Sequence, residues 1–195
     1  MCTKITEVME MAKKTEKAIA DALKKLLAKK PLKKITISDI AEECGINRMT
    51  FYYHYRDVYD LIEHICDDSL KGALAENRTL ADWQVGIRTL MEELRKEKAF
   101  YTGLFQSIER DKVTDYMYDL ISELLQEGMT QVSKNAAITP DERQFIVDFY
   151  TYAFVGLLLQ WVREGMKEEP ALLVERMAKI GQGGLGRGLD AFSAH

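Results

Sequence analysis

The sequence predicts an all-α protein in which an N-terminal helix-turn-helix unit of three helices precedes a larger helical region. Apolar residues recur at helical spacing along most of the chain, and no run of alternating β-branched residues predicts a strand. The 195 residues contain only 3 prolines. The composition, 47% hydrophobic and 30% charged, is that of a packed protein rather than a disordered one.

The first predicted helix covers Lys13–Lys30. Ile19, Leu23 and Leu27 belong to an apolar stripe with helical spacing, and Pro31 follows where the helix is expected to end. The first twelve residues lack the apolar segment of a signal peptide, so we expect a cytoplasmic protein.

The helix-turn-helix is predicted within residues 36–61. Thr36 and Asp39 have the spacing of a capping box at the start of one helix, and Gly45 suits the left-handed residue just beyond its end. Asn47 can cap a second, short helix. A helix, a glycine-containing turn and another helix in this order are the signature of the motif.

The outer face of the second helix is unusual for a surface exposed to water. Phe51 and Tyr55 are four residues apart and are expected to point inward, which turns Met49, Tyr52 and Tyr53 outward. No acid occurs from residue 48 to residue 56, and the hydroxyl, imidazole, aromatic and guanidinium groups found there suit phosphate oxygens and base edges. The alternative is a helix buried under another domain, where its basic side chains would need buried partners.

Residues 36–61 resemble the DNA-binding signature of the tetracycline-repressor (TetR) family of bacterial transcription regulators. Three segments carry the resemblance: T-x-x-D-I-A at Thr36–Ala41, C-G-I-N at Cys44–Asn47 and T-F-Y-Y-H-Y at Thr50–Tyr55. Phe154–Ile180 also resembles, more loosely, the branch of the family that contains dihydroxyacetone-kinase regulators.

The resemblance implies which side chains contact DNA. Phosphate contacts are expected from Thr36, Thr50, Tyr52 and His54, and base-edge contacts from Arg48, Met49 and Tyr53. The chain departs from the family pattern at two positions. Met49 stands where the family often has a small residue, which changes the expected base preference, and Val58 stands where many members have a phosphate-binding lysine, which leaves Arg56 to make that contact.

The charge distribution favours a nucleic-acid partner more than the total charge does. The formal charge is −4, but residues 1–66 carry a net +2 and the remainder carries −6. Six lysines occur between Ala22 and Ile37 without an acid among them: Lys24, Lys25, Lys29, Lys30, Lys33 and Lys34. Such a patch beside a helix-turn-helix is an electrostatic footprint for DNA, although lysines also suit the exposed end of a helix.

The remaining helices are predicted from apolar spacing and capping residues. Asp57 can cap a continuous connecting helix over Val58–Ala75, and a second region is expected to start near Asn77. Its helices are expected over Asp82–Lys98, Ala99–Ile108, Asp111–Ser133, Thr139 to about Gly165, and from Pro170 onward. We therefore expect a DNA-binding domain over residues 1–60, the connecting helix over 58–75, and, from the resemblance, a regulatory and dimerisation domain over 76–195.

The most apolar segment is Phe145–Val162. It is shorter than the ~20 apolar residues of a membrane span and contains Asp148, so we expect no membrane contact. A helix that is apolar on all sides is buried on all sides, which predicts one face in the core and another against a second copy. The resemblance implies a homodimer with the last two long helices in a four-helix interface. The expected interface residues are Phe154, Leu158, Val162, Leu173 and Met177.

Aromatic side chains of the second region either fill an ordinary helical core or line an apolar ligand cavity. The resemblance favours a cavity for a small-molecule effector. The expected lining residues are Phe100, Tyr101, Phe105, Tyr116, Tyr150 and Trp161.

No pattern in the sequence indicates a catalytic, cofactor or metal site. The G-x-G-x-x-G motif at Gly181–Gly186 follows a helix rather than a strand, and only nine residues follow it, so a nucleotide-binding βαβ unit is not expected. The three histidines and three cysteines are scattered without ligand spacing.

The sequence therefore predicts a sequence-specific DNA-binding transcription regulator that binds a pseudo-palindromic operator in double-stranded DNA as a homodimer. We interpret it as a repressor released by an unknown small molecule, with an activator as the alternative within the same family. An interaction protein whose helix-turn-helix binds another protein is the alternative from a different class. An enzyme ranks third, because no nucleophile or acid/base pair is clustered.

Overall fold

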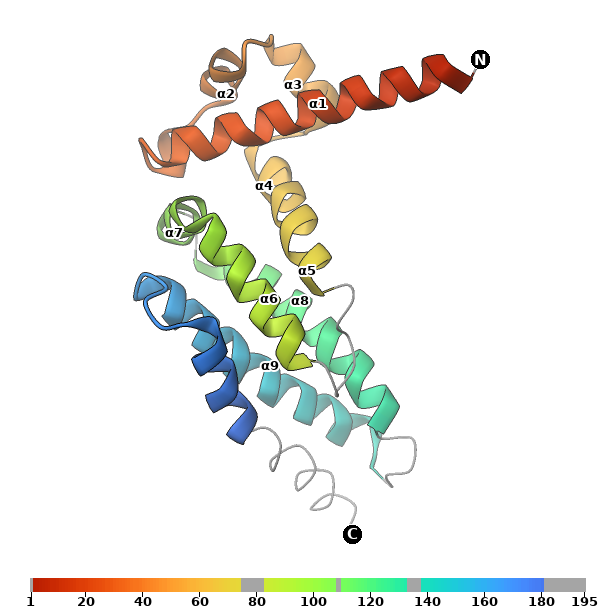
Figure 1. The fold of residues 1–195 in the computed structure, drawn as a ribbon, viewed down its shortest axis with the longest axis vertical. Coiled ribbons are helices and arrows are strands. Elements are labelled where there is room, and N and C mark those ends of the chain that lie inside the picture. The colour runs from red at the N-terminus through yellow and green to blue at the C-terminus, as the bar shows by residue number, and fades with distance from the viewer. Residues whose placement is uncertain (1, 75–82, 108–109, 133–137, 181–195) are drawn as a thin grey trace.

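The computed structural model describes residues 2–74, 83–107, 110–132 and 138–180, and every regular element within these ranges is helical. The predicted all-α fold class is therefore confirmed. A small N-terminal unit, a connecting helix and a larger helical bundle follow one another along the chain (Figure 1). The expected domain start near Asn77 and the motif at Gly181–Gly186 lie outside the described residues.

The N-terminal unit consists of helices α1 (Cys2–Leu27), α2 (Ile37–Cys44) and α3 (Arg48–His54) with the 3-10 turn η1 (Leu32–Lys34). Its core contains Ile19, Leu23, Ile40 and Phe51, which have no exposed surface. α1 starts well before the predicted Lys13 and projects beyond the other two helices (Figure 1). The predicted start of this helix at Lys13 is therefore too late.

The connection between the two parts is not one regular α-helix. α4 (Val58–Cys66) starts at Asp57, whose carboxylate accepts hydrogen bonds from the N–H groups of Tyr59 and Asp60. The chain then continues as the π-helical segment η2 (Asp67–Lys71) and the short helix α5 (Gly72–Leu74). The predicted connecting helix is therefore present without a break from Val58 to Leu74, but its hydrogen bonding is π-helical over Asp67–Lys71. A π-helical turn widens the helix and commonly marks a functional position.

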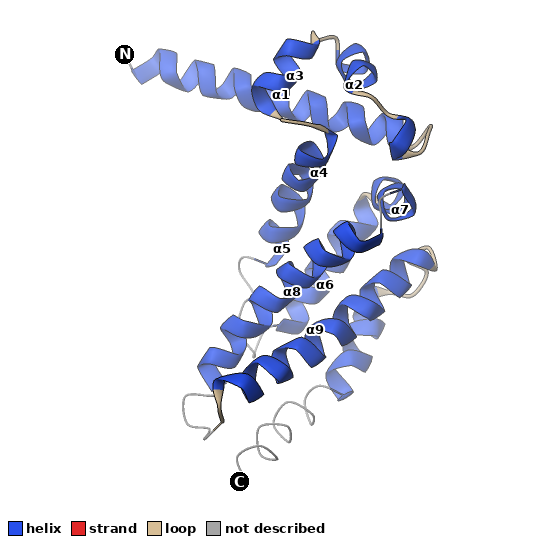
Figure 2. Cartoon of the chain, turned by 180° about the vertical axis from the view of Figure 1, so that it is seen from behind, coloured by secondary structure: helices blue, strands red, loops and turns tan. Residues whose placement is uncertain are grey.

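The bundle contains α6 (Trp83–Lys96), α7 (Lys98–Ser107), α8 (Arg110–Val132), α9 (Pro140–Arg163) and a last helix over residues 170–180. α8 and α9 pack against each other along their lengths (Figure 2). α9 begins as predicted, because Thr139 and Glu142 form a capping box and Pro140 occupies the first turn.

α9 meets the length and composition criteria for a helix that crosses a membrane. Core helices of water-soluble proteins meet them too, and 44% of its most apolar 18-residue window is buried inside the chain. Its acidic residue Asp148 accepts hydrogen bonds of 2.7 Å from the Tyr118 hydroxyl and from Gln144. We therefore interpret α9 as a core helix with one exposed apolar face.

The exposed face of α9 is not the predicted one. The five residues expected at a dimer interface lie in the chain's own core, with at most 6% of their surface exposed: Phe154, Leu158, Val162, Leu173 and Met177. A second copy cannot reach them, so that prediction is wrong. The exposed apolar side chains of α9 are Phe145, Phe149, Tyr152 and Leu157. Apolar residues on all sides of a helix do not indicate which face the core takes.

The N-terminal unit contacts the bundle directly as well as through α4. Lys24 Nζ of α1 lies 2.9 Å from Glu97 Oε1 and 5.7 Å from the centre of the Phe100 ring. In α7, a Cβ added at Gly103 would lie 3.5 Å from the carbonyl oxygen of Leu27. The C-terminal end of α1 is therefore held against α7.

Candidate nucleic-acid interface and ligand cavity

Two capping arrangements fix the helix-turn-helix. The Thr36 N–H and hydroxyl each donate to Asp39 Oδ2 at 2.7 Å, and the Asp39 N–H donates back to the Thr36 hydroxyl. These hydrogen bonds, with the nearby Lys30, lower the pKa of Asp39 to about 2. Gly45 has a φ of 72°, and Asn47 Oδ1 accepts from the Thr50 N–H at 2.8 Å. The turn chemistry predicted from the sequence is present.

α3 buries one face and exposes the other. Phe51 is fully buried and Tyr55 is 5% exposed, with their ring centres 5.8 Å apart. On the opposite side Met49 is 75% exposed, Tyr52 51% and Tyr53 84%. These large side chains lie on a surface of this chain and not in its core, as expected for groups that meet a partner.

Several of the predicted phosphate-binding groups already have partners in the protein. The Thr50 hydroxyl donates to Asn47 Oδ1 at 3.1 Å, and the Arg56 guanidinium lies 3.0 Å from Asp60 Oδ1. The Arg56 side chain is still 83% exposed, so it can turn toward a phosphate. Arg48 is exposed at the first turn of α3.

His54 is placed differently from its neighbours on α3. Its side chain is only 8% exposed, and its Nδ1 lies 3.3 Å from Glu16 Oε1 of α1. The ring therefore ties α3 to α1, and little of it is left to reach a phosphate.

Most of the lysine patch is paired with carboxylates. Lys25 and Lys29 lie 3.9 and 3.5 Å from Glu43, and Lys30 lies 3.0 Å from Asp39. Lys24 faces the bundle, as described above. Of the six, Lys33 and Lys34 form no salt bridge with any residue that the structure describes, and both are exposed. The patch is thus smaller than the sequence suggests.

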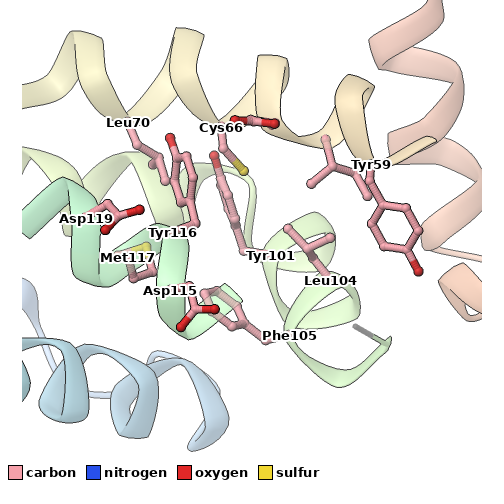
Figure 3. Close-up of a pocket in the computed structure, with 12 residues that line it drawn as sticks. Tyr59, Cys66, Leu70, Tyr101, Leu104, Phe105, Asp115, Tyr116, Met117 and Asp119 are labelled. Atoms are coloured by element: carbon pink, nitrogen blue, oxygen red, sulfur yellow. The ribbon is translucent and has the colours of Figure 1, made fainter. Parts of the chain in front are cut away.

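A cavity of about 310 Å³ lies between the connecting helix and the bundle (Figure 3). α4 and η2 supply Tyr59, Ile62, Glu63, Cys66 and Leu70; α7 supplies Tyr101, Leu104 and Phe105; α8 supplies Asp115, Tyr116, Met117 and Asp119. Its inner wall is apolar and aromatic, and its acidic residues Glu63, Asp115 and Asp119 are exposed at the rim.

Two tyrosines on the inner wall point their hydroxyls toward the connecting helix (Figure 3). The Tyr116 hydroxyl donates to Oδ1 of Asp67, the first residue of η2, at 2.9 Å. Burial and this carboxylate raise the pKa of Tyr116 well above its usual range. The Tyr101 side chain is 1% exposed, and its hydroxyl has no hydrogen-bond partner within the described part of the chain. Burial, the largest cause, also raises the pKa of the Tyr101 hydroxyl.

The cavity contains three of the six aromatic residues predicted for it. Tyr101, Phe105 and Tyr116 line it. Phe100 instead lies against Lys24, and the Trp161 indole N–H donates to the Glu168 carbonyl at 2.8 Å.

Tyr150 also lies away from the cavity, beside Phe149 and Phe154. Composition could not separate these core residues from the lining. The prediction also missed the lining residues of the connecting helix, Tyr59, Glu63, Cys66 and Leu70. Their spacing places them on one face of that helix, and this pattern could have indicated them.

Comparison with known proteins gives two family matches. Residues 19–65 match the family described as "Bacterial regulatory proteins, tetR family", and residues 81–183 match "Transcriptional regulator C-terminal region". By sequence, the chain is 29% identical over 91 residues to the dhaKLM operon transcriptional activator DhaS of Lactococcus lactis. The aligned residues cover 47% of this chain and 49% of DhaS. It is 23% identical over 178 residues to the uncharacterised regulator YxbF of Bacillus subtilis, which is 87% of this chain and 45% of YxbF. The chain thus spans about half the length of these two regulators.

Solved structures share the fold. The dihydroxyacetone kinase operon activator DhaS aligns with a TM-score of 0.69 at 20% identity, over 92% of this chain and 98% of that one. The fatty acid degradation regulator FadR from Bacillus halodurans aligns at 0.62 with 16% identity, over 87% and 95%. NalD of Pseudomonas aeruginosa, a repressor of a multidrug efflux pump, aligns at 0.61 with 17% identity, over 86% and 94%.

Proposed function

The chain belongs to the TetR family of bacterial transcription regulators, and from this premise we propose that it binds operator DNA in the cytoplasm as a homodimer and releases it when a small molecule fills the cavity. The observation that carries the DNA-binding part is the exposed face of α3. Met49, Tyr52 and Tyr53 stand out from it beside Arg48, and no acid interrupts it. Arginine suits guanine edges, and tyrosine hydroxyls suit phosphates.

The exposed face of α9 supports the dimer. Phe149 is 60% exposed, Tyr152 66% and Leu157 38%, and Leu172 of the last helix is 54% exposed. Phe149 and Tyr152 lie on the same side of α9, and exposed apolar surface of this kind marks an interaction site. A two-fold dimer formed through this face carries two α3 helices, one for each half-site of the operator. The half-sites are then separated by one turn of the DNA helix, ~34–36 Å, or by a multiple of it.

The cavity lies where a ligand can act on the connecting helix. Tyr116 of α8 holds Asp67 at the start of the π-helical segment, and Cys66 and Leu70 from the same stretch line the cavity. A ligand among these groups competes with their present packing and tilts α4, which changes the separation of the two α3 helices. By linkage, DNA must then weaken ligand binding by the same factor as the ligand weakens DNA binding.

A mobility-shift experiment at two salt concentrations tests the DNA-binding proposal. Fragments selected from the source genome should bind with an affinity that falls steeply as salt rises, because lysine and arginine displace counterions from phosphates. Binding to no fragment, together with a partner protein held through α3, would instead favour the protein-interaction alternative.

A second candidate, an activator, is favoured by the similarity to DhaS, which is itself an operon activator. A reporter under the selected operator separates the two candidates. Deletion of the regulator raises expression if it is a repressor and lowers it if it is an activator.

A further inference from the structure

We propose that the cavity selects a positively charged, otherwise apolar small molecule, such as an alkylammonium or arylammonium compound. The proposal rests on the proposed function only in treating the cavity as the effector site. Its starting point is the charge of the lining. Glu63, Asp115 and Asp119 line the cavity, whereas no lysine, arginine or histidine is among the described residues that do so.

The three carboxylates approach the cavity from two elements. Glu63 belongs to α4, and Asp115 and Asp119 lie one helical turn apart on α8. None of the three forms a salt bridge with another residue in the described ranges, in contrast to Asp67 beside them, which pairs with Lys71. Acids gathered at the mouth of an apolar cavity attract a cation and repel a carboxylate or phosphate.

The inner wall offers a second, independent feature. Tyr101 lines the inner wall with 1% of its surface exposed, and its hydroxyl has no hydrogen-bond partner in the described part of the chain. A hydroxyl can accept a hydrogen bond from an ammonium N–H. The rings of Tyr101, Phe105 and Tyr116 give this wall an aromatic surface, and ring faces attract cations. A volume of about 310 Å³ suits a compact ligand.

Three probes with the same tail and different head groups test the charge preference: n-octylammonium, 1-octanol and octanoate. Titration calorimetry on the intact protein should show n-octylammonium binding at least about tenfold more tightly than octanoate, which is about 1.4 kcal/mol. The preference should shrink between about 0.05 M and about 0.5 M NaCl, because the rim carboxylates are exposed to screening. Octanoate binding as tightly as n-octylammonium would overturn the proposal, as would failure of all three probes to bind.

Matched variants identify the groups responsible. The double variant Asp115→Asn, Asp119→Asn should bind n-octylammonium about tenfold more weakly and bind 1-octanol with unchanged affinity. Both side chains are exposed, so the substitutions should not affect folding. Glu92→Gln removes an exposed acid of α6 outside the cavity and should change nothing. Unaltered n-octylammonium affinity in the double variant would refute the assigned carboxylates.

A parallel mobility shift separates this proposal from the proposed function. Probe binding with the expected charge preference but with unchanged DNA affinity supports the ligand class and overturns the effector role. Salt-dependent DNA binding by a protein that binds none of the probes overturns the ligand class and leaves the DNA-binding proposal standing.

Discussion

Two residues of α9 distinguish the proposed dimer interface from the protomer core. Phe149 and Leu158 are nine residues apart, which places them on opposite sides of the helix. Phe149 is 60% exposed and Leu158 is 1% exposed. Phe149→Ala should therefore weaken dimerisation and spare the protomer, whereas Leu158→Ala should destabilise the protomer itself.

The expected magnitudes follow from these exposures. A phenylalanine buries about 150–250 Å², so a 60% exposed ring retains about 90–150 Å², worth about 2–4 kcal/mol at ~25 cal/mol per Å² when a partner covers it. Alanine keeps part of this contact, so we expect the dimer to weaken by at least about tenfold. Leu158→Ala creates a cavity in a packed core and should cost about 2–5 kcal/mol, or about 4–20 °C in Tm.

Sedimentation velocity over a concentration series gives the dimer dissociation constant, and thermal melts give Tm. Because dimerisation itself raises Tm, the melts are compared at one protein concentration. An unchanged dissociation constant for Phe149→Ala would refute the assigned interface. Loss of dimer in Leu158→Ala at an unchanged Tm would restore the face that the sequence predicted.

Three further predictions concern the helix-turn-helix. Arg48→Ala should cost about 1–3 kcal/mol of discrimination between operator and random DNA, and equal losses on both in competition mobility shifts would count against a base contact. The pKa of Asp39 is lowered to about 2 in the folded state, so its stabilisation is complete above the unfolded-state value of about 3.9 and is lost as pH falls toward about 2. Asp39→Asn should flatten this part of a profile of Tm against pH, and an unaltered profile would show that other carboxyls dominate. Gly45→Ala should lower the stability to urea by about 1 kcal/mol because Gly45 has a φ of 72°. A clash is not the cause, since no atom beyond the neighbouring residues lies within 4 Å of the added Cβ. Gly45→Asn should recover part of the loss.

Local chemistry made the N-terminal unit predictable. Thr36 with Asp39, Gly45 and Asn47 each act through groups within a few residues, so their spacing is enough to place two helices and the turn. Contacts between residues that are far apart in the sequence could not be predicted in this way. His54 matches the expected motif, yet its ring is turned to Glu16, which is 38 residues earlier in the chain.

The same limit applies to the bundle. The π-helical segment begins at Asp67, whose hydrogen bond comes from Tyr116, 49 residues later, and no local residue type marks it. The aromatic content of the bundle predicted a cavity, but Trp161 and Tyr150 are as aromatic as Tyr101 and only packing separates core from lining. The exposed face of α9 was undetermined for a related reason, since both of its sides are apolar.

The contact of Lys24 with Glu97 and Phe100 matters for anyone who recombines parts of such regulators into biosensors. An exchange of DNA-binding units at the boundary near residue 60 keeps most of α4 but separates Lys24 from Glu97 and Leu27 from Gly103. Under the proposed mechanism, the exchanged unit would then respond to a ligand through α4 alone. A chimera that carries the end of α1 and the start of α7 from the same parent keeps both connections, so crossover points are best chosen as a pair.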